Sequence, residues 1–208
     1  MRTDLQQIIS SPVAAYEEGL RFFMGQGTLN ETLRRIVKDL ENRRIEYSLI
    51  GAVALNQHCY RRFTEDIDLL VSKEGLEKFQ KELGGLGYHP AQTGATKKFR
   101  TTQENATVKM IAAGEFPGDG KPKPVRFPEP NENQIEIDGI KTLTLEKLIE
   151  LKLASGMTAP HRLKDLADVQ EIIKIKDLTA DFAEKLNPFV REKFLELQKR
   201  LPNRLSKK

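Results

Sequence analysis

The sequence is poor in the features that mark secreted, zinc-structured and membrane proteins. Its single cysteine, Cys59, excludes a disulfide within the chain, and no Cys/His spacing suits a zinc site. No apolar run approaches the ~20 residues of a membrane span, and no N-terminal run is typical of a signal peptide. We therefore expect a cytoplasmic protein without a membrane association, in which Cys59 is a small buried residue rather than a reactive thiol.

An excess of charge of one sign is also missing. The 34 Lys and Arg residues nearly balance the 30 Asp and Glu residues, for a formal net charge of +4, and most are interspersed as on solvated helix faces. The exceptions are the basic run at 97–100 and the tail from Lys199 onward. Both permit contact with phosphates or nucleic acid, but a plain solvated surface is the simpler interpretation.

The hydrophobic pattern predicts a mixed α/β (α+β) protein. A chain of 208 residues can bury one core and carry a smaller helical appendage. We expect a mixed sheet flanked by helices over 1–143, followed by a C-terminal helical bundle over 144–208 that packs on it. Helical spacing occurs at 13–23 and 30–40, β-type runs occur at 47–50, 67–71 and 107–112, and a hairpin with an Asp-Gly turn is expected at 135–143.

One long irregular segment interrupts this pattern. Residues 114–130 are too rich in Gly and Pro for a helix or strand, and they carry Lys121, Lys123 and Arg126. Loops of this length are usually functional or disordered. A lid over a substrate site is one interpretation, and simple exposed irregular structure is the other.

Two carboxylates in the second β-type run are the first candidate site. Asp66 and Asp68 are two residues apart, and strand side chains alternate between faces, so both project from one side of the sheet. Adjacent like charges repel unless a cation lies between them, and Mg²⁺ prefers carboxylate oxygens and substrate phosphates. The alternative is that Asp66 and Asp68, with Glu65, are only the polar end of an edge strand.

A glycine turn fifteen residues earlier favours the metal interpretation. Gly51 stands where a strand is expected to end and a helix to begin, so that backbone N–H groups face any nearby anion. Without a Cβ, Gly51 lets a phosphate approach the backbone closely. A phosphate turn followed by a metal-binding carboxylate pair suits nucleotidyl transfer from a nucleoside triphosphate. By itself, a glycine after a strand is more often a simple turn.

These segments resemble a known signature. Residues 49–58, followed by 61–69, resemble the polymerase-β-like nucleotidyltransferase superfamily, in which a Gly-Gly or Gly-Ser turn precedes an Asp-x-Asp strand. The sequence is similar to bacterial AbiEii-type nucleotidyltransferases, several of which are toxins of toxin–antitoxin systems. The resemblance implies a nucleoside triphosphate substrate, Mg²⁺ or Mn²⁺ as cofactor, an RNA, protein or small-molecule acceptor, and an antitoxin partner.

The resemblance also implies roles for individual residues. It makes Asp66 and Asp68 catalytic metal ligands, and Gly51, Ala52 and Arg62 part of the nucleotide site. Residues 148–154 and 162–169 resemble the C-terminal helical motif of the family. On this basis Lys152 is expected to bind the triphosphate and Asp165 to be a catalytic or structural partner. Without the resemblance, Lys152 is more simply a solvent-facing lysine, and Asp165 and Asp168 pair with Arg162 or Lys164 at the surface.

Two positions depart from the family pattern. Ala52 stands where Gly or Ser is usual, so a Ser hydroxyl contact to phosphate is lost. More importantly, the third carboxylate expected on a later strand falls near Lys109, and Glu104 and Glu115 are the nearest substitutes. A one-residue slip in this alignment reverses the face on which Lys109 lies. Two hypotheses therefore remain: a metal-dependent nucleotidyltransferase, or a degenerate domain that binds a nucleotide or a partner without catalysis.

Overall fold

The computed structural model describes residues 4–200, and the chain divides into two compact units. The first unit consists of Met1–Gln57, Arg61–Ala113 and Pro128–Leu143. The second consists of His58–Tyr60, Gly114–Phe127 and Thr144–Lys208. Two short segments that precede residue 144 therefore group with the C-terminal helices.

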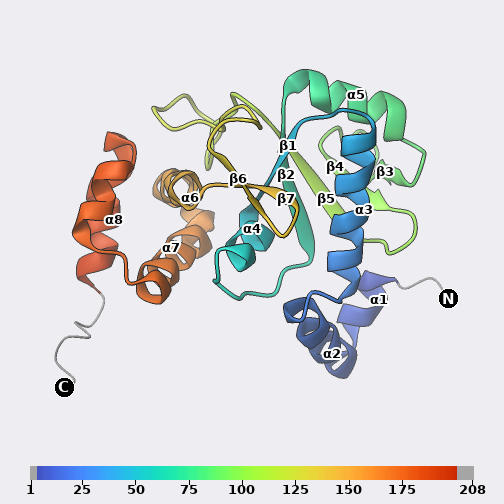
Figure 1. Ribbon diagram of the computed structural model, residues 1–208, viewed down its shortest axis with the longest axis horizontal. Coiled ribbons are helices and arrows are strands. Elements are labelled where there is room, and N and C mark those ends of the chain that lie inside the picture. Colours follow the sequence, from blue (N-terminus) through green and yellow to red (C-terminus); the bar gives the residue numbers. More distant parts are fainter. Residues whose placement is uncertain (1–3, 201–208) are drawn as a thin grey trace. The chain divides into compact units, whose positions relative to one another are not determined.

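The first unit is built around a mixed sheet (Figure 1). The seven strands follow the order β3-β4-β5-β2-β1-β7-β6. The strands are β1 (Tyr47–Ile50), β2 (Asp66–Val71), β3 (Tyr88–Pro90), β4 (Lys98–Thr101), β5 (Thr107–Ala112), β6 (Gln134–Ile137) and β7 (Ile140–Leu143). The helices are α1 (Leu5–Ser10), α2 (Pro12–Phe23), α3 (Thr28–Asn42), α4 (Gly51–Gln57) and α5 (Lys73–Leu83).

Strand β2 lies in the middle of this sheet and sets its register. It pairs antiparallel with β1 and parallel with β5, so that Asp68 stands beside Ile50 on one side and Lys109 on the other. Four of its six residues are completely buried, because helices pack on a sheet made of apolar strands: Ile67, Leu69, Leu70 and Val71. The strand that carries the two carboxylates is therefore among the most rigidly held in the unit.

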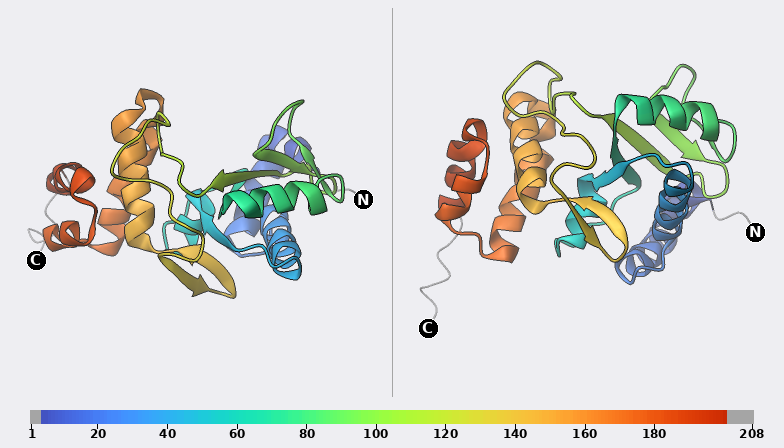
Figure 2. Two further views of the ribbon diagram at one scale, coloured as in Figure 1. Left: turned by 90° about the horizontal axis from the view of Figure 1, so that it is seen from above. Right: turned by 45° about the horizontal axis from the view of Figure 1, so that its top comes forward.

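The second unit is helical. It contains α6 (Leu145–Thr158), η1 (Pro160–Arg162), α7 (Leu163–Lys176), η2 (Ala180–Lys185) and α8 (Pro188–Lys199), and α6 packs against both α7 and α8 (Figure 2). Leu153, Val169 and Phe194, one from each of these three helices, are fully buried in its core.

The irregular segment Gly114–Phe127 is fixed within the second unit. The Lys123 ammonium donates hydrogen bonds to the carbonyls of Pro117 and Lys121, at 2.8 Å each, and to the Asp119 carboxylate at 2.6 Å. A Cβ on Gly118 would lie 2.3 Å from the Thr158 hydroxyl, so this part of the segment packs directly on α6. It is irregular, as predicted, but held by its own lysine, and a lid role stays a prediction.

The α/β class and the mixed sheet flanked by helices are confirmed. Strand β4 (Lys98–Thr101), which contains residues 98–100 of the basic run, was not predicted. The expectation that Cys59 is buried is wrong, because the residue is exposed in a left-handed turn (φ 74°) after α4. Residues 201–208 of the basic tail lie outside the described residues. Over 4–200, no helix is both long and apolar enough to cross a membrane.

Candidate functional site

Strand β2 presents its two carboxylates on one face, as the alternation predicts. Asp66 and Asp68 are partly exposed, whereas Ile67 and Leu69, which point to the other face, are completely buried. The Thr64 hydroxyl accepts a hydrogen bond from the Asp66 amide at 3.4 Å at the start of the strand. The carboxylate pair therefore stands on a fixed backbone at the edge of the core.

Gly51 lies directly against this pair. It follows the last residue of β1 with φ at +70°, a left-handed conformation that L-residues with a side chain adopt at a cost. A Cβ built on Gly51 would stand 2.2 Å from Oδ2 of Asp68. Glycine is thus required here both by its positive φ and by the lack of space for a Cβ. The second reason was not predicted, because the group that comes close to Gly51 is a carboxylate of the chain itself. Ala52, the next residue, is buried in the first turn of α4.

Lys109 faces the two carboxylates. The parallel pairing of β2 with β5 places it beside Asp68, and its Nζ forms an ion pair with Oδ2 of Asp66. Of the two directions left open for Lys109, the structure therefore has the one that faces the carboxylates. The side chains of Lys109 and Asp66 are 39% and 31% exposed, so the pair is accessible to solvent and ligands.

No third acid joins Asp66 and Asp68 in the described part of the chain. Over residues 4–200, no group of three or more His, Cys, Asp or Glu is placed to hold a metal ion. Glu104 is buried and engaged by Arg35 and Thr101. Burial alone would raise its pKa, but the Arg35 guanidinium outweighs this and holds the pKa of Glu104 below its ordinary value. Glu115 belongs to the second unit.

This geometry does not fit a three-carboxylate metal site. Asp66 and Asp68 remain side by side, but an ammonium group already engages one of them. Three carboxylates would carry a formal charge of −3, whereas two carboxylates and a lysine carry −1. The electrostatic attraction for divalent cations is correspondingly smaller.

The segment after α4 is anchored at Arg62. The Asn56 side chain accepts a hydrogen bond from the Arg62 amide at 2.7 Å and donates one to its carbonyl at 2.8 Å. Asn56 therefore fixes the backbone of Arg62 next to the end of α4. Arg61, its neighbour, is exposed and turns toward a different feature, a cavity in the same unit.

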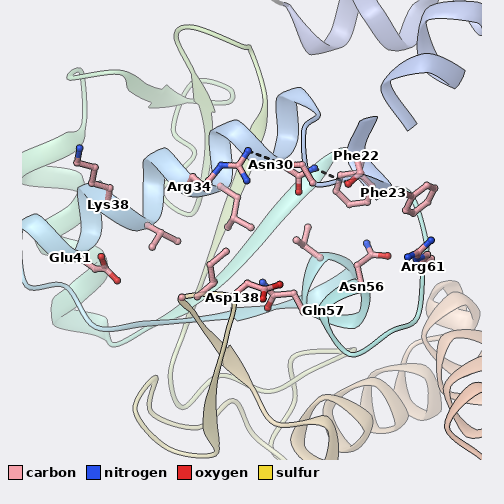
Figure 3. A pocket seen from close by; sticks show the side chains of 16 residues that line it. Phe22, Phe23, Asn30, Arg34, Lys38, Glu41, Asn56, Gln57, Arg61 and Asp138 are labelled. Atoms are coloured by element: carbon pink, nitrogen blue, oxygen red, sulfur yellow. Dashed lines mark hydrogen bonds between the residues drawn. The ribbon is translucent and has the colours of Figure 1, made fainter. Parts of the chain in front are cut away.

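This cavity of about 430 Å³ was not predicted. It lies between α2, α3, α4 and the β6–β7 turn, and combines apolar walls with charged side chains (Figure 3). Asn30, Arg34, Lys38, Asn56 and Arg61 contribute to it. These residues are scattered over three segments, so no local motif in the sequence indicates that they meet.

The second unit brings together the other candidate residues. Lys152 on α6 contacts two aspartates of α7, with its Nζ 2.8 Å from Oδ1 of Asp165 and 2.7 Å from Oδ2 of Asp168. Oδ2 of Asp165 also accepts hydrogen bonds from the Ser155 hydroxyl at 2.7 Å and from Nε of Arg162 at 2.8 Å. The cluster therefore holds two cations and two anions.

Burial decides between the two interpretations of these residues. Lys152, Asp165 and Asp168 are 9%, 6% and 1% exposed, so the expectation of a solvent-facing lysine and surface aspartates is wrong. Burial would raise the pKa of Asp165, but Lys152, with help from Ser155 and Arg162, holds the pKa below its ordinary value. The roles of Lys152 in triphosphate binding and of Asp165 in catalysis stay predictions.

Comparison with known proteins supports the fold. No family model matches the sequence, and no curated protein matches it. Among solved structures, the chain is similar to the antibiotic-resistance factor ANT(2'')-Ia in solution, with 16% identity, a TM-score of 0.52 and coverage of 80% of this chain and 93% of that one. A crystal structure of ANT(2'')-Ia with adenylyl-2''-tobramycin gives the same identity and TM-score, with coverage of 80% and 96%.

A third structure, JHP933 from Helicobacter pylori, matches at 18% identity and a TM-score of 0.44, over 81% of this chain and 86% of that one. At these identities the comparisons bear on architecture alone. Together with the seven-stranded mixed sheet and its flanking helices, the likeness to ANT(2'')-Ia shows that the chain has a nucleotidyltransferase-like fold.

Proposed function

We propose that this protein binds a nucleoside triphosphate within a nucleotidyltransferase-like fold, without carrying out metal-dependent nucleotidyl transfer. The observation that carries the proposal is the ion pair between Lys109 and Asp66, at the position where the resemblance expects a third metal ligand. Metal-dependent transfer needs divalent cations at the reacting phosphate, and these in turn need acidic ligands. Lys109 replaces one such ligand with a cation.

A single ammonium group is suited to binding and poorly suited to catalysis. It donates up to three hydrogen bonds, and one of these goes to Asp66, so others remain for phosphate oxygens. It supplies one positive charge to stabilise the negative charge that develops during transfer. Two divalent ions would supply four. Arg62 is the further phosphate contact that we propose. Gly51 and Lys152 are assigned this role by the resemblance alone, and the Asp68 carboxylate takes the space beside the Gly51 Cα.

A second candidate function is supported by a different observation. Asp66 and Asp68 are both present on one face. The Lys109 side chain is 39% exposed, so it can turn toward solvent and release the carboxylates. On this alternative the protein is a Mg²⁺- or Mn²⁺-dependent nucleotidyltransferase. The likeness to ANT(2'')-Ia, crystallised with adenylyl-2''-tobramycin, favours a small-molecule acceptor for it. The AbiEii-type assignment, an RNA or protein acceptor, and an antitoxin partner belong to the same alternative.

Two measurements on the same preparation separate the candidates. Calorimetric titration with each ribonucleoside triphosphate, in EDTA and in Mg²⁺, is expected to give the same affinity in both buffers and weaker binding for Lys109→Ala. Incubation with labelled triphosphate and Mg²⁺ or Mn²⁺, in the presence of total RNA, protein and a small-molecule cell extract, is expected to transfer no label. Transfer that disappears in Asp68→Ala would establish the second candidate. Absence of nucleotide binding in both buffers would overturn the proposal.

A further inference from the structure

The basic run at 97–100 has no role in the proposed nucleotide site. Strand β4 divides this run between the two faces of the sheet. Phe99 is buried, and its ring packs against that of Phe79 on α5, with the centroids 5.0 Å apart. Strand side chains alternate, so Lys98 and Arg100 point to the face opposite α5, where Lys98 is exposed and Arg100 is half-buried. The structure thus places two cations of the run on one face.

The register of the sheet joins these cations to the carboxylate face. In the antiparallel pairing of β4 with β5, Lys98 stands directly beside Lys109, and Arg100 stands beside Thr107. Lys109 in turn stands beside Asp68 on β2. Directly paired residues point to the same face, so Lys98, Arg100 and Lys109 share one surface, which we call the cationic strand face. It starts at the carboxylate pair and extends away from β1.

The charges of this face are only partly compensated by the chain itself. The Cβ atoms of directly paired residues lie about 5 Å apart, so the like charges of Lys98 and Lys109 repel each other. Lys109 has Asp66 as a partner on its other side, but neither Lys98 nor Arg100 forms an ion pair within residues 4–200. Arg100 donates from Nη1 to the carbonyl and the side chain of Asn105, at 3.2 Å each, and keeps its other donors. An anion bound on this face would remove the repulsion.

The spacing of the cations matches a nucleic-acid backbone. Lys98 and Arg100 are two residues apart on a strand, a separation of about 7 Å, which is close to that of successive phosphates along an extended nucleic-acid strand. Lys and Arg bind such phosphates without reading the bases. No exposed large apolar side chain lies on β4 or β5. The face therefore lacks both the apolar side chains that enter a membrane and the aromatic rings that stack on bases.

We propose that the cationic strand face binds the sugar–phosphate backbone of a nucleic-acid strand, RNA or DNA. The inference goes beyond the proposed function, because this binding needs no nucleotide. Since β1 and β5 flank β2 on opposite sides, Gly51 and the cationic strand face lie on different sides of the carboxylates. Contacts to three phosphates give a slope of log affinity against log salt of about −2, at roughly −0.7 for each contact. The affinity is that of sequence-independent binding, about 10⁻⁴–10⁻⁶ M at physiological salt.

Fluorescence anisotropy on the full chain tests this binding. The probes are a labelled uridine RNA and a labelled thymidine DNA of about twelve nucleotides, without nucleotide and over about 50–200 mM KCl. Both are expected to bind with similar affinity, and Lys98→Glu/Arg100→Glu is expected to weaken binding at least about tenfold and to make the salt slope shallower. Lys73→Glu/Lys81→Glu, at two exposed positions of α5, is the matched control. Each double variant lowers the net charge by the same amount, so the control should change the affinity very little.

A wild type that binds neither probe at the lowest salt would overturn the proposal, and so would an equal loss in both double variants, since net charge alone would then explain the binding. A strong preference for one probe would show that sugars or bases are read, against a backbone contact. Binding to phosphatidylserine vesicles but to neither probe would assign the face to a membrane.

Calorimetry with a nucleoside triphosphate separates this inference from the proposed function. Lys98→Glu/Arg100→Glu is expected to leave the triphosphate affinity unchanged. A loss of that affinity with intact binding of both probes would assign Lys98 and Arg100 to the nucleotide and contradict the inference. Absence of triphosphate binding would overturn the proposed function alone, because the anisotropy is measured without nucleotide. Far-ultraviolet circular dichroism on every variant shows whether the fold is intact.

Discussion

Each unit of the molecule places one lysine between neighbouring aspartates, but the two arrangements differ in burial and in charge balance. Lys109 stands over Asp66 and Asp68 on the face of a strand and is 39% exposed. Lys152 is enclosed by Asp165 and Asp168 between two helices, and Arg162 supplies a second cation. The first group carries a formal charge of −1, whereas the second is neutral.

This difference predicts that the two lysines contribute differently to stability. A buried pair is expensive to break, because removing one partner leaves an uncompensated charge in the core. A half-exposed pair contributes little to stability, because water screens it and competes for it. The lysine that a ligand or a substitution can displace at low cost is therefore Lys109, and the lysine that holds two helices together is Lys152.

The largest effect is expected from Lys152→Ala. This change leaves two buried carboxylates facing each other and is expected to lower the free energy of unfolding by about 3–5 kcal/mol. Hydrogen exchange over α6 and α7, together with urea denaturation, measures it. Lys164→Ala, at an exposed position on α7, is the matched control and should change stability very little. An equally small change for Lys152→Ala would contradict the structural role of the cluster.

The next effect comes from Gly51→Ala, which tests how tightly the turn holds Asp68. Gly51 and Gly85 both have positive φ values, of 70° and 84°, but only a Cβ on Gly51 meets another atom. Gly85→Ala is expected to cost about 1–2 kcal/mol for backbone strain alone. Gly51→Ala should cost more in urea denaturation, since the added methyl overlaps the Asp68 carboxylate. Equal costs would show that Asp68 moves away freely.

Acid titration sharpens the comparison further. The pKa of Asp165 lies below its ordinary 3.8 because Lys152 and its neighbours outweigh burial. A carboxyl whose pKa is lower in the folded state stabilises the fold above the unfolded pKa, and this contribution is lost as the pH falls through the folded value. The thermal unfolding midpoint of the helical unit should therefore decrease when the pH is lowered below about 4. Asp165→Asn should reduce this dependence, and an unchanged profile would exclude Asp165 as its source.

The smallest effect is expected from Lys109→Ala. The ion pair with Asp66 is partly exposed on both sides, so its loss should change the free energy of unfolding by less than about 1 kcal/mol. Urea denaturation in parallel with Lys152→Ala gives the comparison directly. A loss as large as that of Lys152→Ala would mean that Lys109 is structural and not part of a ligand site.

Much of the first group could be predicted from the sequence, because strand geometry is a local rule. Alternation alone put Asp66 and Asp68 on one face, and the family resemblance singled out Lys109 but left open which face it lies on. What could not be predicted is that the Lys109 ammonium reaches Asp66, since that depends on the register between β2 and β5. Register is set by the packing of the whole sheet.

The cluster of Lys152, Asp165 and Asp168 was harder to predict, because the elements that pack on a helix decide which of its faces is buried. Apolar residues stand all around α6, so its pattern does not mark Lys152 as lying on a buried or an exposed face. The partners of Lys152 lie 13 and 16 residues further on, in another helix. The cavity lined by Arg34, Asn56 and Arg61 was missed for the same reason, since its walls come from separate elements.

The central claim is that Lys109 keeps divalent cations from the Asp66–Asp68 pair. The most direct test measures Mn²⁺ binding to the Lys109→Asp variant by electron paramagnetic resonance. Restoring a third carboxylate changes the formal charge of the group from −1 to −3. The account predicts no measurable binding for wild type, weak binding for Lys109→Ala, and the tightest binding for Lys109→Asp, lost again in Lys109→Asp/Asp68→Ala. Wild type that binds Mn²⁺ as tightly as Lys109→Asp, through Asp68, would contradict it.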